Sequence, residues 1–346
     1  MIVVRTPFRL PLGGGGTDLP SYYKKYEGFL ITAAINKYMF ININLPAIVD
    51  KIKINYSKTE IVGLDEIDKI EHNIVRETLR YLKVRQPIEI HSMADLSGGT
   101  GMGSSSSYTV GLLKALNLML RRYVPIQVLA EEACKIEIDL IGKPIGKQDQ
   151  YAAAFGGIIQ LEIDQLGNVT VTPLHLDHEI IYELENRLLM FYTDIERDAN
   201  KILAEQSEKI AKGSMIAEKT KNENVDDGEA AVQAMHKIKE ISREVKRALE
   251  NGEVDQFGKL LNEHWMVKKS VSDQMSNSQI DEWYEMAMNN GALGGKIMGA
   301  GGGGGFMLFC VENGKRKHLR KTLENAGLKY MDFKFDWEGS KTLVDI

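Results

Sequence analysis

Hydrophobic residues in the first half of the chain follow two periods, one typical of strands and the other of helices. Extended segments are indicated at residues 2–4, 29–43 and 51–56, and helical spacing is present over 64–82 and 126–140. No helical pattern separates the long strands of the first hundred residues. The sequence therefore predicts an α+β fold instead of a strict alternation of strands and helices.

The second half of the chain begins with a further strand pattern, at residues 187–192, and is then strongly helical from about residue 200 to 289. Its last part shows strand, helix and strand patterns in that order, at 306–311, 315–326 and 329–335. We expect two domains with a boundary near residue 180, namely residues 1–180 and 181–346.

The composition is that of an ordinary globular chain, since 346 residues with 43% hydrophobic content can fill one large or two medium cores. The formal net charge of −5 and the lack of a basic cluster argue against a nucleic-acid partner. No apolar run approaches the length of a membrane span, and the N-terminus resembles a strand and not a signal peptide. We therefore expect no membrane association and a cytoplasmic location. Cys134 and Cys310 lie in apolar segments and are expected to be buried free thiols.

Residues 96–107 contain four glycines and a serine cluster directly before a helical run. Glycines allow tight turns that bring backbone N–H groups close to anionic oxygens, and the start of a helix adds the positive end of its dipole. A flexible linker is the alternative, but the strand pattern at 87–91 places this loop between a strand and a helix. No Gly-Lys-Ser/Thr follows, so the loop is not a Walker loop. The segment predicts a phosphate cradle formed by Gly98, Gly99, Gly101, Gly103, Ser104, Ser105 and Ser106.

Near the N-terminus, a strand leads into four consecutive glycines at 13–16, which are followed by Thr17 and Asp18. Asp18 could accept hydrogen bonds from sugar hydroxyls, and an arginine on the strand could steady a phosphate or a catalytic carboxylate. The alternative is a glycine turn in which Asp18 is a helix N-cap.

Two acids stand on either side of a glycine–proline turn, Glu137 at the end of a helical pattern and Asp149 after the turn. If they converge, one carboxylate can bind Mg²⁺ and the other can accept a proton from a substrate hydroxyl. Ordinary surface charges are the alternative. Lys143 and Lys147 lie in the same turn and carry charges that suit a phosphate, but we expect both to be exposed.

A second glycine-rich stretch, residues 294–305, precedes the strand pattern at 306–311. It contains a formal GxGxxG at Gly299, Gly301 and Gly304, but a strand follows where a dinucleotide-binding motif requires a helix. We expect a loop that closes over the phosphate site from the second domain, through Gly299, Gly301 and Gly302.

In order and spacing, these blocks resemble the GHMP small-molecule kinases over nearly the whole chain. The resemblance rests on the strand leading to Thr17 and Asp18, the loop 98–107, the pair Glu137 and Asp149, and the late glycine loop. It implies a two-domain fold, with an N-terminal ribosomal protein S5 domain 2-like part and a C-terminal ferredoxin-like α/β sandwich. It also implies a phosphotransferase that uses ATP and Mg²⁺.

The resemblance assigns roles to matching residues. Ser105 would be the hydroxyl that coordinates Mg²⁺, and Glu137 the carboxylate that ligates it. Asp149 would be the catalytic base, and Arg9 would stabilise its ionised form and the developing negative charge. Positioning and charge neutralisation would supply most of the catalysis. Whether Asp149 removes the proton or orients the hydroxyl stays open.

The segments 10–20 and 146–157 are most similar to the heptose branch of the family, which implies phosphorylation of the anomeric hydroxyl of a heptose 7-phosphate. Galactokinase-like members carry a Glu-His pair just before the Thr-Asp, where this chain has two glycines. We expect the missing side chains to leave room for a longer sugar arm and its phosphate. The guanidinium of Arg197 suits that phosphate. The expected substrate contacts are Gly15, Gly16, Thr17, Asp18 and Arg197.

Two alternatives stay open. Another sugar 1-kinase, of the fucose or galactose type, would keep the same chemistry with a different sugar. A non-catalytic sugar sensor on a galactokinase-like scaffold would instead bind a partner protein, although the presence of Ser105, Glu137, Asp149 and Arg9 disfavours it. The expected partner is a small sugar phosphate as substrate. Whether the chain also forms a homodimer is left open.

Overall fold

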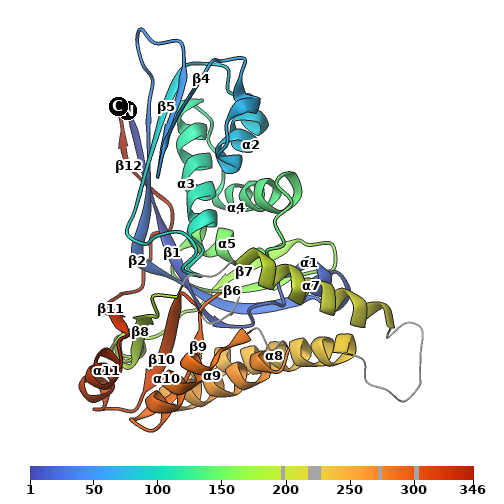
Figure 1. The fold of residues 1–346 in the computed structure, drawn as a ribbon, viewed down its shortest axis with the longest axis vertical. Coiled ribbons are helices and arrows are strands. Elements are labelled where there is room, and N and C mark those ends of the chain that lie inside the picture. Colours follow the sequence, from blue (N-terminus) through green and yellow to red (C-terminus); the bar gives the residue numbers. More distant parts are fainter. Residues whose placement is uncertain (196–198, 217–226, 272–274, 300–303) are drawn as a thin grey trace.

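The computed structural model describes residues 1–195, 199–216, 227–271, 275–299 and 304–346. Two sheets organise these residues. In Figure 1 the larger sheet and the helices α2 to α5 occupy the upper part of the molecule, while the smaller sheet and α9 to α11 lie below. The α+β fold expected from the sequence is confirmed.

Within the described residues, the larger sheet has eight strands. The main path runs β12–β1–β2–β5–β3–β4, and β6 pairs with both β2 and β7. The bounds are β1 (Ile2–Gly13), β2 (Gly28–Asn44), β3 (Ile52–Asn55), β4 (Thr59–Val62), β5 (Ile88–Ala94), β6 (Ile158–Ile163), β7 (Val169–Pro173) and β12 (Lys341–Asp345).

Strand β2 serves two partners along one edge, because residues 28–33 pair with β6 and residues 39–44 with β5. Strand β1 pairs with β2 over almost its whole length, with a register shift between Pro7 and Phe8. Such a bulge redirects the side chains that follow it, and the next residue is Arg9. Helices α3, α5 and α8 all pack against β1, and the strand is buried from Thr6 onward.

The helices are α1 (Pro20–Tyr26), α2 (Asn73–Leu82), α3 (Ser104–Met119), α4 (Ile126–Cys134), α5 (Gln148–Phe155), α6 (His178–Arg187), α7 (Ala199–Ile216), α8 (Asp227–Glu250), α9 (Val254–Lys269), α10 (Ser278–Met288) and α11 (Arg316–Asn325). A short 3₁₀ turn, η1, spans Ile67–Lys69, and a π-helical turn, η2, spans Lys135–Leu140. Helix α3 is buried along most of its length because its apolar residues face both the sheet and the neighbouring helices.

The smaller sheet has the order β11–β8–β10–β9, with all three pairs antiparallel. Its strands are β8 (Leu188–Tyr192), β9 (Ala292–Ile297), β10 (Phe306–Val311) and β11 (Lys329–Met331). Helix α9 lies directly on β9, where a Cβ on Gly294 would come 2.1 Å from the carbonyl oxygen of Gly258. This backbone contact fixes how side chains from α9 and β9 meet at the end nearer the larger sheet.

The structure corrects several sequence expectations. The seven-residue helix α1 lies between β1 and β2, where the pattern indicated no helix, and the helical pattern at 64–82 divides into η1 and α2. The strand expected over 329–335 is reduced to β11. The domain boundary near residue 180 stays a prediction.

Strand β12 pairs with β1, so the end of the chain returns to the larger sheet. One apolar cluster reaches from Val4 to Leu308 and joins the two sheets.

Candidate active site

Arg9 and Asp149 form a bidentate ion pair where β1 meets the start of α5. The Nε of Arg9 lies 2.6 Å from Oδ1 of Asp149, and Nη2 lies 3.1 Å from Oδ2. The third nitrogen, Nη1, donates to the carbonyl oxygen of Gly101 at 2.6 Å. Because Arg9 is only 6% exposed, its planar guanidinium is fixed in this orientation. The pair therefore holds a carboxylate beside the glycine-rich loop.

Asp18 organises the start of α5 and does not cap the helix that follows it in sequence. Its Oδ2 accepts the backbone N–H of Gln148, the first residue of α5, at 3.0 Å, and Oδ1 accepts the N–H of Gly16 at 3.0 Å. The N-cap of α1 is Leu19, so the alternative of Asp18 as an N-cap there is wrong. Burial raises the pKa of Asp18, although the two backbone hydrogen bonds oppose this. A side chain at Gly146 would overlap this carboxylate, since its Cβ would lie 1.9 Å from Oδ2.

The glycine-rich loop ends at the N-terminus of α3, where Gly103 is the N-cap in a left-handed conformation, with φ 77°. Ser104, Ser105 and Ser106 form the first turn of this helix, so its free N–H groups point toward the loop. A Cβ on Gly103 would lie 3.0 Å from Oδ2 of Asp149, which shows how close the carboxylate comes to the loop. Gly98 and Gly99 have no atom within 4 Å of their Cβ positions and border open space.

The late glycine loop contacts the first glycine loop through backbone atoms. A Cβ on Gly101 would lie 2.7 Å from the carbonyl oxygen of Met298, and one on Gly299 would lie 2.8 Å from that of Gly101. A Cβ on Gly305 would likewise lie 2.3 Å from the carbonyl oxygen of Thr100. Gly301 and Gly302 lie outside the described residues, so the closing role of this loop stays a prediction.

Glu137 lies on the π-helical turn η2 and is completely buried. The hydroxyl of Ser105 and the ammonium of Lys143 both contact its Oε1, the latter at 2.8 Å. The amide of Gln150 donates to Oε2 at 2.9 Å. Single π-turns are frequent at functional sites, because they shift a side chain out of the regular helical register.

The expectation that Lys143 and Lys147 are exposed is wrong. Their side chains are 16% and 12% exposed, and each forms an ion pair, with Glu137 and Glu131 respectively. Lys143 thus places a cation next to the two residues expected to ligate Mg²⁺.

The oxygens of Ser105 and Glu137 fit a magnesium site, since Mg²⁺ prefers hard oxygen donors and usually uses one or two carboxylates together with substrate phosphates. A completely buried carboxylate also requires a cationic partner. Among the described residues, His, Cys, Asp and Glu nowhere gather in groups of three, so any cation here depends on a sparse protein ligand set.

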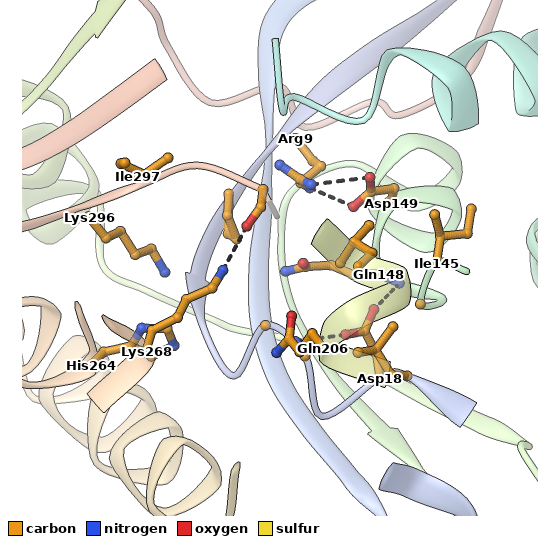
Figure 2. A pocket seen from close by; sticks show the side chains of 17 residues that line it. Arg9, Asp18, Ile145, Gln148, Asp149, Gln206, His264, Lys268, Lys296 and Ile297 are labelled. Carbon is orange, nitrogen blue, oxygen red and sulfur yellow. Dashed lines mark hydrogen bonds and ion pairs between the residues drawn. The ribbon is translucent and has the colours of Figure 1, made fainter. Parts of the chain in front are cut away.

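A small cavity of about 80 Å³ lies beside the Arg9–Asp149 pair. Gly15, Gly16 and Asp18 form part of its wall, and Figure 2 shows Gln148 and Gln206 beside it. A Cβ on Gly15 would have only Oε1 of Gln148 within 4 Å, so this glycine does leave room. The space beside Gly16 is already filled, since a Cβ there would lie 3.0 Å from Nε2 of Gln206 and 3.1 Å from Sδ of Met235.

Thr17 does not line this cavity. Its hydroxyl is buried and donates to the carbonyl oxygens of Gly14, at 2.8 Å, and Phe29, at 2.9 Å. The side chain therefore closes the glycine turn, and we no longer expect it to contact a substrate. Arg197, the other expected phosphate contact, lies outside the described residues.

Three basic residues in the cavity wall were missed by the sequence analysis: His264, Lys268 and Lys296. They come from α9 and β9, more than a hundred residues after Asp149. Lys268 donates to the carbonyl oxygen of Gly299 at 2.7 Å. Burial lowers the pKa of Lys268 to about 8 and lowers the pKa values of Lys296 and His264 as well. A lysine within an otherwise apolar strand pattern, as at Lys296, is the signal that could have identified one of them.

A larger cavity of about 720 Å³ lies on the other side of the glycine-rich loop. Its volume is within the ~300–1,000 Å³ typical of small-molecule sites. Gly98, Gly99 and Ser105 line it, together with the stacked rings of His72 and Tyr108, whose centroids are 4.8 Å apart. Burial lowers the pKa of His72, which favours the neutral ring. The loop thus separates an aromatic cavity from a cationic one.

None of the helices in the described part of the chain combines the length and apolar character that crossing a bilayer requires.

Comparison with known proteins places these features in a family. Residues 72–157 match the family model of the GHMP kinases N terminal domain, and residues 245–328 match that of the GHMP kinases C terminal domain. The chain is 34% identical to D-glycero-alpha-D-manno-heptose 7-phosphate kinase of Campylobacter jejuni, over 99% of this chain and 98% of that protein. It is 26% identical to galactokinase of Pyrococcus furiosus, over 99% and 97% of the two chains. The crystal structure of a D-glycero-D-manno-heptose 1-phosphate kinase from Bacteriodes thetaiotaomicron superimposes with a TM-score of 0.78 at 27% identity, covering 100% of both chains.

Proposed function

Because this chain belongs to the GHMP kinase family, we propose that it phosphorylates the anomeric hydroxyl of D-glycero-D-manno-heptose 7-phosphate, forming the 1,7-bisphosphate with ATP as phosphoryl donor. Its family and its sugar kinase relatives make it a phosphotransferase that acts on a sugar hydroxyl. The observation that carries the proposal is the part-buried Arg9–Asp149 pair, which lies between the glycine-rich loop and the cavity lined by Lys268 and Lys296.

The nucleotide is assigned to the larger, aromatic cavity. The stacked rings of His72 and Tyr108 offer an apolar wall for a base, and the loop 98–103 leads from there to the N-terminus of α3. Backbone N–H groups at that terminus suit the phosphates of ATP. The terminal phosphate would then lie near Gly103, whose Cβ position is 3.0 Å from the Asp149 carboxylate.

The sugar is assigned to the cavity beside Arg9 and Asp149. Its anomeric oxygen would attack the γ-phosphorus, the bond from that phosphorus to the bridging oxygen would break, and ADP would leave. The hydroxyl proton would pass to Asp149, or Asp149 would orient the hydroxyl until the proton is lost to solvent. Arg9 holds the carboxylate in place through two hydrogen bonds and places positive charge beside the transferring group.

Ser105 and Glu137 are the residues that would hold Mg²⁺, which would neutralise charge on the phosphate oxygens when bound. In the structure Lys143 supplies the positive charge next to Glu137. Lys143 therefore has to share this carboxylate with the metal ion or move to the nearby phosphates.

The heptose assignment is supported by the whole-length similarity to a heptose 7-phosphate kinase and by the space at Gly15. The space expected at Gly16 is occupied by Gln206 and Met235, so the longer sugar arm is expected to pass Gly15. The names of the two heptose relatives differ in the phosphate position, 7 in one and 1 in the other. The acceptor position therefore has to be determined directly.

A coupled ADP-release assay with Mg·ATP tests the proposal. The acceptors are heptose 7-phosphate, heptose 1-phosphate, mannose, fucose, galactose, mevalonate and homoserine, and the product position is read by ³¹P NMR. We expect turnover with heptose 7-phosphate and a new anomeric phosphate signal. Turnover confined to another acceptor would refute the substrate, and sugar binding without ADP release would favour the sensor alternative.

Two carboxylate variants accompany this assay. Asp149→Asn is expected to abolish most turnover, whereas Asp139→Asn alters an exposed acid on η2 and serves as the matched control. Equal loss in both variants would point to a general defect and not to a role of Asp149.

A further inference from the structure

The wall of the cavity opposite Asp18 and Asp149 is built from two lysines and a histidine. His264 and Lys268 lie one turn apart on α9, and Lys296 extends from β9 beside them. Their exposed fractions are 2%, 7% and 2%. Figure 2 shows both lysines reaching toward the space that Arg9 and Gln148 face from the other side. Basic groups from two elements of the smaller sheet region thus meet a site built mainly by the larger sheet.

These buried polar groups lack matching partners. Among the described residues neither Lys268 nor Lys296 forms an ion pair with a carboxylate, and the hydrogen bond of Lys268 goes to a backbone carbonyl. Neither ring nitrogen of His264 has a hydrogen-bond partner, and the same is true of Nε2 of Gln148 on the facing wall. Leaving such groups buried without partners costs folding free energy, so their convergence on one cavity indicates a ligand.

The missing ligand is an anion. The two acids that line the cavity are already engaged, since Arg9 pairs with Asp149 and two backbone N–H groups bind Asp18. The pKa values of both lysines are lowered by burial first and by neighbouring cations second. A group with two negative charges would relieve this repulsion and accept hydrogen bonds from several donors at once.

The phosphates of the nucleotide do not account for this anion site. None of the three basic residues lines the larger cavity next to the glycine-rich loop. Lys268 donates to the carbonyl oxygen of Gly299, and it is the backbone of Met298 and Gly299 that contacts Gly101 of the glycine-rich loop.

We propose that Lys268, Lys296 and His264 bind the phosphate that the sugar substrate already carries, away from the reacting hydroxyl. The inference rests on the proposed function for the identity of the sugar, but the anion site itself rests on the buried cations. It also supplies a set of phosphate contacts among the described residues, in addition to the expectation for Arg197.

Steady-state kinetics of Lys296→Met and Lys268→Met test the site with two acceptors, heptose 7-phosphate and the same heptose without phosphate. We expect kcat/KM for the phosphorylated sugar to fall at least tenfold, while kcat/KM for the unphosphorylated sugar and KM for ATP change less than twofold. Lys259→Met, an exposed lysine on the same helix, is the control and is expected to match the parent chain. Equal losses with both acceptors, or a selective rise in KM for ATP, would overturn the inference.

A binding measurement separates this inference from the sugar assignment. With a non-hydrolysable ATP analogue filling the nucleotide site, inorganic phosphate is titrated while the midpoint of thermal unfolding is followed. We expect phosphate to stabilise the parent chain and Lys259→Met equally, and Lys296→Met much less. Equal stabilisation of all three proteins refutes the anion site. If the site binds phosphate but heptose 7-phosphate is not a substrate, the proposed sugar fails while the inference of a phosphorylated substrate stands.

Discussion

Replacing Lys268 by Met is expected to stabilise the fold while it impairs activity. The pKa of Lys268 is lowered from 10.5 to about 8 by burial and by the nearby charge of Arg9, against the opposing effect of Asp18. At ~1.4 kcal/mol for each factor of ten, this corresponds to about 3 kcal/mol against the charged lysine at pH 7. Methionine also loses the hydrogen bond to Gly299, which is worth about 1 kcal/mol. The expected net gain at pH 7 is therefore about 2 kcal/mol.

The pH dependence gives this prediction its sharpest form. Between pH 8 and 10.5 the unfolded chain binds a proton at this lysine that the folded protein has lost, so the parent chain becomes more stable as the pH rises. Below pH 8 both states carry the proton and the full penalty is present. The advantage of Lys268→Met should be constant below pH 8 and should shrink by more than about 2 kcal/mol by pH 10.

Urea unfolding of the parent chain, Lys268→Met and Lys259→Met at pH 7, 8.5 and 10 measures these differences. The other titratable groups that face the site are Arg9, Asp18, Asp149, His264 and Lys296. The titration of groups away from the site cancels in the difference between variants at each pH, whereas the pKa values of Lys296 and His264, which Lys268 lowers, also change in Lys268→Met. The exposed control should stay within about 0.5 kcal/mol of the parent chain. The reasoning is refuted if Lys268→Met is less stable than the parent chain at pH 7, or if its advantage is the same at all three pH values.

Four further outcomes are expected. Asp149→Asn should lower kcat by about 10²–10⁴-fold with ATP binding nearly intact, as measured by nucleotide titration; a near-normal kcat would contradict the base assignment. Ser105→Ala should raise the Mg²⁺ concentration needed for half-maximal rate, and an unchanged requirement would exclude it as a ligand. Lys143→Met should cost about 3 kcal/mol in EDTA because Glu137 loses its cation, with part of the loss recovered in Mg²⁺; identical stability in EDTA and Mg²⁺ would contradict this. Gly101→Ala should lower unfolding free energy and kcat together, because its φ is +76° and its Cβ would meet the opposing loop, and a neutral effect would show that the loops separate.

The local parts of the site could be predicted from sequence because each depends on a short segment. Left-handed φ angles require glycine at Gly101 and Gly103, and a loop between a strand and a helix is marked by its flanking periodicities. The Arg9–Asp149 contact was expected only through resemblance to a family, since the two residues are 140 positions apart. The short helix α1 was missed because seven residues carry too little periodic signal.

Charge in the interior was the least predictable property. Lys143 and Lys147 were expected in solvent because lysine is usually exposed, yet each lies against an acid brought close by the turn between η2 and α5. Gly16 was expected to leave space, yet Gln206 from α7 and Met235 from α8 fill it. In each case the neighbour belongs to another element of the fold.

The sequence by itself determined most of the strands, the main helices, the glycine turns and the acids that make phosphoryl transfer feasible, because backbone conformation and hydrophobic period are set by neighbouring residues. Strands β4, β9 and β12 were not predicted. Only the tertiary structure decided that Lys268 and Lys296 face Arg9 across one cavity. Their positions depend on how closely α9 can approach β9 at Gly258 and Gly294, and on how that pair of elements packs against β1. Such contacts join residues far apart in the chain, so no local pattern encodes them.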